Sequence, residues 1–180
     1  MLCNAGEAAA VVAIVRAALA AGTPPHAIAV LTGTPAQMHA VLDAAARSGE
    51  PLPGGAQLQL GTYNKRDLAR LGLKAPPPPG EQRRGWRDEP APAPAHPVLL
   101  AELDCFHAEA ELVIASLVRQ PGDAVASALP LSDAGWPRKL LGRATKQLVL
   151  LGSRPWLADA SPAWAAALGA MPVASLRSHG

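Results

Sequence analysis

The chain has 180 residues, of which 49% are apolar but only 3% aromatic, and its formal net charge is +2. This length predicts one domain with a core of Ala, Val, Leu and Ile packed between helices and strands, which favours an α/β domain over a β-sandwich. The small charge does not by itself indicate a nucleic-acid binder, because affinity for phosphates comes from clustered basic side chains.

The first predicted element is a helix. Asn4 begins it as a cap with Glu7 three positions later, and apolar residues then recur at helical spacing up to Gly22. The run is similar to the apolar part of a secretory signal, but no basic residue precedes it and it is too short to cross a bilayer. The two cysteines, Cys3 and Cys105, lack a pairing pattern. We therefore expect an intracellular protein, cytoplasmic or nuclear, that is not secreted and has no membrane partner.

A strand and a second helix follow the first helix. The apolar run at residues 27–31 predicts a buried strand. Thr34 is a cap for the next helix, with Pro35 in its first turn and Gln37 as the third residue of a capping box. Residues 57–62 are compatible with another strand. Helix, strand and helix joined by short connections predict a layered α/β unit.

Residues 75–97 are rich in proline and polar residues, and they cannot bury enough apolar surface to order themselves. We expect a flexible insertion. Three interpretations stay open: a solvated loop, a proline-rich ligand for the aromatic groove of a protein partner, or a basic arm that touches nucleic acid. The basic arm would consist of Arg83, Arg84, Trp86 and Arg87.

The segment from Leu103 to Leu151 holds two apolar runs, at 112–118 and 148–151, which predict strands. Between them lies a basic connection that consists of Arg138, Lys139, Arg143 and Lys146. Such an arrangement predicts charged groups at a sheet edge, where phosphate-bearing ligands usually bind. Ser161 and Pro162 then begin a last short helix that ends near Gly169, and we expect the tail at 172–180 to be frayed.

Several common catalytic motifs are absent from the sequence. It contains no phosphate loop of the form G-x-x-x-x-G-K-[ST], no G-x-G-x-x-G and no G-x-S-x-G, and its five histidines show no ligand spacing. We therefore expect no metal site, no nucleophilic triad and no small-molecule enzyme of Rossmann type.

The order of four segments carries a resemblance to a known family. The segments are NAGEAAAVVAIVRAALAAG, HAIAVLTGTPAQ, LDCFHAEAELVIASLVRQ and LSDAGWPRKLLGRATKQLVLLGSRPWL. Together they resemble the second RecA-like domain of superfamily 1 helicases of the Upf type, over nearly the whole chain outside the insertion. The resemblance implies that residues 1–180 form one three-layer RecA-like domain with a mostly parallel sheet and without its own phosphate loop.

Two family motifs imply nucleotide-binding residues. VLTGTPAQ is similar to I-T-P-Y-x-x-Q and keeps Gln37, while LDCFHAEAE is similar to T-V-D-x-F-Q-G-x-E and keeps Glu109. The family motif that ends in T-R-A places Arg143 where an arginine reaches the γ-phosphate held by another domain, which implies a catalytic role.

The resemblance also implies nucleic-acid contacts. A strand with an S-x-V-R ending is matched by Ser116 and Arg119. For the threonine of the T-V-D motif, direct alignment gives Glu102, whose carboxylate would repel phosphate, and Thr62 is the rival candidate. The expected ligand is single-stranded RNA or DNA.

In this family the phosphate loop and the Mg-binding acidic motif belong to a first RecA-like domain. ATP and Mg are therefore expected only together with that separate partner, and we predict that the chain alone does not hydrolyse ATP. The chain is then a fragment, one half awaiting a partner, or a remnant. Motif residues replaced by His107, Ala108 and Gly142 favour the alternative of a non-catalytic pseudo-helicase scaffold for protein partners.

Overall fold

The computed structural model describes residues 3–60, 97–102, 109–118 and 135–172, and the structural statements below concern these residues. Five strands, five α-helices and two short 3-10 helices occur in them. In chain order the elements are α1 (Ala5–Ala20), η1 (Pro25–Ala27), β1 (Ile28–Thr32), α2 (Pro35–Arg47), η2 (Pro53–Gly55), β2 (Leu58–Leu60), β3 (Val98–Glu102), β4 (Ala110–Ser116), α4 (Trp136–Leu141), β5 (Ala144–Leu151), α5 (Arg154–Ala160) and α6 (Pro162–Gly169).

The strands form one sheet in the order β2-β3-β1-β4-β5, and every neighbouring pair is parallel. β1 is the central strand, with Val30 in register with Leu100 of β3 and with Ile114 of β4. All five carboxyl ends therefore meet at one edge of the sheet. The predicted α/β class with a mostly parallel sheet is confirmed.

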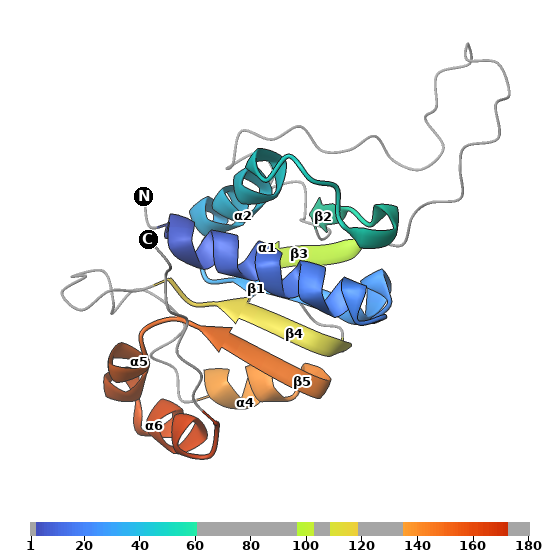
Figure 1. Cartoon of the computed structure of the whole chain (residues 1–180). Coiled ribbons are helices and arrows are strands. Elements are labelled where there is room, and N and C mark those ends of the chain that lie inside the picture. The colour runs from blue at the N-terminus through green and yellow to red at the C-terminus, as the bar shows by residue number, and fades with distance from the viewer. Residues whose placement is uncertain (1–2, 61–96, 103–108, 119–134, 173–180) are drawn as a thin grey trace, which may run out of the picture.

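Helices cover both faces of this sheet, as parallel sheets require (Figure 1). On one face α1 and α2 pack against the side chains of Ile28 and Val30. On the other face α4, α5 and α6 pack against Ala29 and Leu31. The alternation along β1 thus divides the core into two clusters, and the result is the three-layer arrangement expected of a RecA-like domain.

The capping signals correctly place both N-terminal helices. The Asn4 side chain accepts a hydrogen bond from the Glu7 backbone N–H at 3.1 Å, and Thr34 does the same for Gln37 at 3.2 Å. Each bond satisfies a backbone donor that a helix start leaves free. Gly22 follows α1 with a φ of 91°, which glycine adopts without steric cost.

The predicted strands and the last helix are confirmed with small shifts. The run at 27–31 is β1, the run at 112–118 is β4, and the run at 148–151 is the second half of the longer β5. Residues 58–60 form β2. The last helix, α6, is capped by Ser161, and its Trp164 and Leu168 are buried on one side as expected.

Besides the two 3-10 helices, three elements were not predicted: β3, α4 and α5. β3 is a five-residue strand directly after the proline-rich stretch, and α4 spans six residues without a side-chain cap. α5 did have a signal, because Ser153 caps it and Pro155 stands in its first turn. Short elements such as these gain their stability from packing rather than from local propensity.

Some predictions lie outside the described residues. These are the flexible insertion at 75–97 apart from Pro97, the frayed tail apart from Pro172, and the residues Thr62, Arg119, Cys105 and His107.

Candidate functional site

A cluster of polar side chains lies at the carboxyl edge of β1 and β4. We call Asn4, Glu7, Gln37 and Ser116 the polar cluster. The Gln37 Nε2 donates to Ser116 Oγ at 3.0 Å and to the Asn4 carbonyl at 3.2 Å, while Gln37 Oε1 accepts from the Asn4 N–H at 2.7 Å. Ser116 Oγ donates in turn to Glu7 Oε2 at 2.8 Å. Two predicted site residues, Gln37 and Ser116, are therefore in direct contact.

Three elements position this cluster. Asn4 and Glu7 belong to the start of α1, Gln37 to the first turn of α2, and Ser116 is the last residue of β4. The Gly33 N–H donates to the Ser116 carbonyl at 3.1 Å, which fixes the chain where β1 turns into α2. Because buried polar groups need partners, the cluster holds the starts of two helices against one strand end.

Burial decides what these side chains are able to do. Gln37 and Ser116 both have 0% of their surface exposed. Gln37 was expected to complete a capping box, but its amide atoms bond to Asn4 and Ser116. Sequence reasoning found Asn4 and Glu7 only as parts of a cap, because their contacts to Gln37 and Ser116 join distant parts of the chain.

Glu7 is the ionisable member of the polar cluster. Desolvation by burial raises the pKa of its carboxyl above the ordinary value of 4.5, and the hydrogen bond from Ser116 opposes this shift. A proton therefore binds to the Glu7 carboxylate more tightly in the folded protein than in the unfolded one. Stability from this group is fully present below the unfolded pKa and is lost as pH rises through the folded pKa.

Replacing Glu7 by glutamine is expected to stabilise the protein at pH 8 relative to the parent chain, because the amide keeps an acceptor for Ser116 without a buried charge. The difference should shrink as pH falls toward the ordinary pKa of a carboxyl. Urea unfolding of both proteins at several pH values measures this. Exposed Asp43→Asn serves as a control, and a Glu7→Gln gain that does not depend on pH would contradict the prediction.

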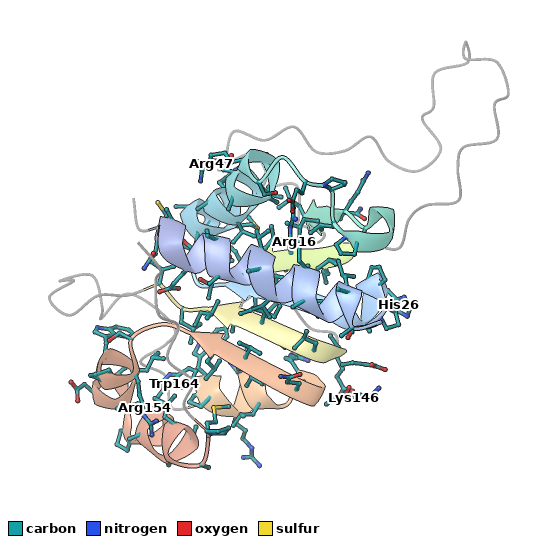
Figure 2. All side chains as sticks on the ribbon, in the orientation of Figure 1. Arg16, His26, Arg47, Lys146, Arg154 and Trp164 are labelled. Carbon is teal, nitrogen blue, oxygen red and sulfur yellow. The ribbon has the colours of Figure 1, made fainter. Side chains whose placement is uncertain are left out.

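Two further predicted site residues within the described ranges lie at the opposite, amino-terminal edge of the sheet. Arg143 precedes β5 and Glu109 precedes β4, and the Ala110 N–H donates to the Arg143 carbonyl at 2.9 Å. Glu109 is exposed and Arg143 is partly exposed. Figure 2 shows Lys146 and His26 at this end of the sheet, and His26 precedes β1.

The basic connection does lie at a sheet edge, but at the amino-terminal one. Arg138 and Lys139 are exposed on α4, and the Lys139 ammonium lies 5.4 Å from the centre of the Trp136 ring. Lys146 forms an ion pair with Glu111 at 2.8 Å. Phosphate-bearing ligands of open parallel sheets usually bind at the carboxyl edge, so the geometry does not reproduce the expected phosphate site.

The four predicted site residues that the structure describes thus form two pairs that do not meet. β4 runs from Ala110 to Ser116, and a strand rises about 3.3 Å per residue, so the two edges lie roughly 20 Å apart. Gln37 and Arg143 cannot both contact the same phosphate group of a ligand bound to this chain.

The described parts of the chain hold no group of three or more His, Cys, Asp or Glu side chains that could bind a metal ion. No helix in the described ranges is long and apolar enough to cross a membrane. A hollow of about 410 Å³ lies beside β5, and its lining is mostly apolar.

Comparison with known proteins adds no relative, since neither a protein-family model nor a curated protein matches the chain. The fold and the geometry of the two edges are therefore the basis for inferring a function.

Proposed function

We propose that this chain is a helicase-like second RecA domain that acts as a non-catalytic scaffold for protein partners. The observation that carries the proposal is the complete burial of Gln37 and Ser116. Their side chains are hydrogen-bonded to each other and to the other members of the polar cluster, Asn4 and Glu7. In the resembled family these two positions contact nucleotide and nucleic acid. Here the same side chains join α1, α2 and β4.

The hydrogen bonds of the Gln37 amide support a structural role for this residue. Both N–H groups of the Gln37 amide have acceptors, and its oxygen has a donor. A nucleotide could use these groups only after breaking buried bonds, and each buried polar group left without a partner costs about 1–3 kcal/mol. The cluster therefore supports a structural role better than ligand binding.

The purified chain is expected to show no ATP turnover with Mg, and Arg143→Ala is expected to change nothing. An arginine that stabilises phosphoryl transfer is worth about 10³–10⁵ in rate, so its removal would be plain in an active enzyme. A phosphate-release assay on both proteins measures this. Turnover by the parent chain that Arg143→Ala abolishes would overturn the scaffold proposal.

A second candidate is a RecA-like domain that completes an ATP site on a separate first domain and binds single-stranded RNA or DNA. The observation in its favour is the partial exposure of Arg143 beside exposed Glu109, where a group from another domain could reach both. Fluorescence anisotropy with labelled RNA and DNA at about 50 and 200 mM salt tests it. Binding that weakens with salt favours this candidate, and no binding favours the scaffold.

Protein partners of the scaffold can be sought through the proline-rich insertion at 75–97. Pull-down with the parent chain and with a variant that lacks these residues compares partner recovery. Unchanged recovery would exclude the insertion as the docking segment and direct attention to the folded surface. The paucity of cysteine supports an intracellular setting for such partners.

A further inference from the structure

β5 is an outermost strand of the sheet, at the end opposite β2 (Figure 1). It spans eight residues and pairs with β4 on one side. No strand among the described residues pairs with its other side. A free strand edge presents a row of backbone donors and acceptors, and it is a template for pairing with another chain.

The hollow of about 410 Å³ follows this edge. Its lining includes residues 147–151 of β5, Ile14 of α1 from one layer and Leu168 of α6 from the other. Arg154 and Leu157 of α5 and the chain at 171–172 complete it on the α6 side. The hollow therefore lies across the open end of the layered structure, between the two sets of helices. An added strand in this place would extend the sheet and stay covered on both faces.

Side chains of both core clusters extend to the unpaired edge of β5, where they are only partly buried. Leu148 and Leu150 pack at the border of the α4–α6 cluster, and Val149 packs at the border of the α1–α2 cluster, yet all three are only partly buried. Apolar side chains left half-exposed on both faces of one edge strand fit a partner strand that brings apolar side chains to both faces.

The strand segment along the hollow is complementary to itself. Antiparallel pairing about Val149 sets Leu148 opposite Leu150 of a second copy, Gln147 opposite Leu151, and Val149 opposite Val149. Residues directly opposite each other share a face of the sheet, so leucine meets leucine on the α4–α6 side. Lys146, the one charged residue of β5, falls opposite Gly152 and not opposite its own copy.

We propose that two copies of this chain dimerise through antiparallel pairing of their β5 strands about a two-fold axis at Val149. The pairing makes one continuous ten-stranded sheet from two five-stranded sheets. A second copy is favoured as the occupant because Leu148, Val149 and Leu150 read the same in both directions, so each meets an apolar side chain of the other copy, and Lys146 lies outside this stretch. Two-fold contacts of this kind close on themselves and do not grow into fibres. The dimer goes beyond the proposed scaffold role, since it does not depend on whether the chain binds nucleotide.

Sedimentation velocity of the full chain from about 1 to 100 μM tests the dimer. Val149→Lys and Val149→Glu each place like charges opposite each other at the axis and should raise the dissociation constant at least about tenfold. An equimolar mixture of the two variants should dimerise again, because only a two-fold axis at this residue sets lysine against glutamate. The control is exposed Thr145→Lys, which lies on the same strand but outside the paired segment and should dimerise normally.

Circular dichroism and urea unfolding show whether the variants fold. If the Val149 variants do not, exposed Gln147→Lys replaces them, since it puts a charge against the partner's apolar segment without disturbing the core. A parent chain that stays monomeric throughout, a dimer indifferent to Val149→Lys, or a mixture that fails to dimerise would each overturn the proposal. A further outcome is a monomer whose β5 amides are protected from hydrogen exchange and lose that protection when residues 173–180 are removed. The chain's own residues 173–180 would then occupy the hollow, and the dimer proposal would be overturned.

Discussion

Gln37→Leu is expected to lower the free energy of unfolding by about 2–3 kcal/mol. Leucine fills a similar volume but leaves the Asn4 N–H and carbonyl without their Gln37 partners and takes a donor from Ser116. Buried polar groups without partners pay their full desolvation cost, which exceeds the apolar gain of the leucine. The midpoint of urea unfolding measures the loss.

Gln59→Leu is the matched control, because Gln59 is exposed on β2 and such surface changes stay within about 0.5 kcal/mol. Combining Gln37→Leu with Ser116→Ala should cost less than the sum of the single changes, since both act on one network. If Gln37→Leu is as stable as the parent chain, the polar cluster does not hold the helices. Gln37 would then have no structural role.

Trp164→Ala is expected to cost about 3–5 kcal/mol, the range for removing a buried aromatic side chain. Trp164 is 1% exposed and is the largest fully buried side chain in the described structure, on the inner side of α6 (Figure 2). It packs in the cluster that contains Leu140, Leu157 and Leu168. The surrounding leucines and Trp136 cannot fill the whole cavity that Trp164 leaves, so the packing of α4–α6 on the sheet should weaken.

Trp156→Ala is the comparison for this change. Trp156 lies on α5 at the border of the same cluster but is only partly buried, so its loss should be clearly smaller. Thermal unfolding followed by tryptophan-independent far-UV circular dichroism reports both. Equal losses of stability at the two positions would mean that the degree of burial does not determine how much each tryptophan contributes. The α4–α6 layer would then not be organised around Trp164.

The local features of the N-terminal half were predictable for a physical reason. Caps at Asn4 and Thr34, proline after a cap and apolar runs each act within a few residues of themselves. Of the elements missed, α4 has no side-chain cap, and β3 is a short run that is held by pairing with β1 and β2. In the candidate site too, local patterns predicted individual residues, whereas the contacts between those residues depend on distant segments of the chain.

The sequence by itself determined the α/β class, the starts of α1, α2 and α6, and the identity of Gln37, Ser116, Glu109 and Arg143 as residues of interest. Only the tertiary structure decided that the first two touch each other in the core and that the last two lie at the opposite edge of the sheet. Strand direction and strand order set the edge at which a residue emerges, and both arise from pairing between segments far apart in the chain. For that reason a motif order could predict a set of site residues, but it could not predict that they do not converge.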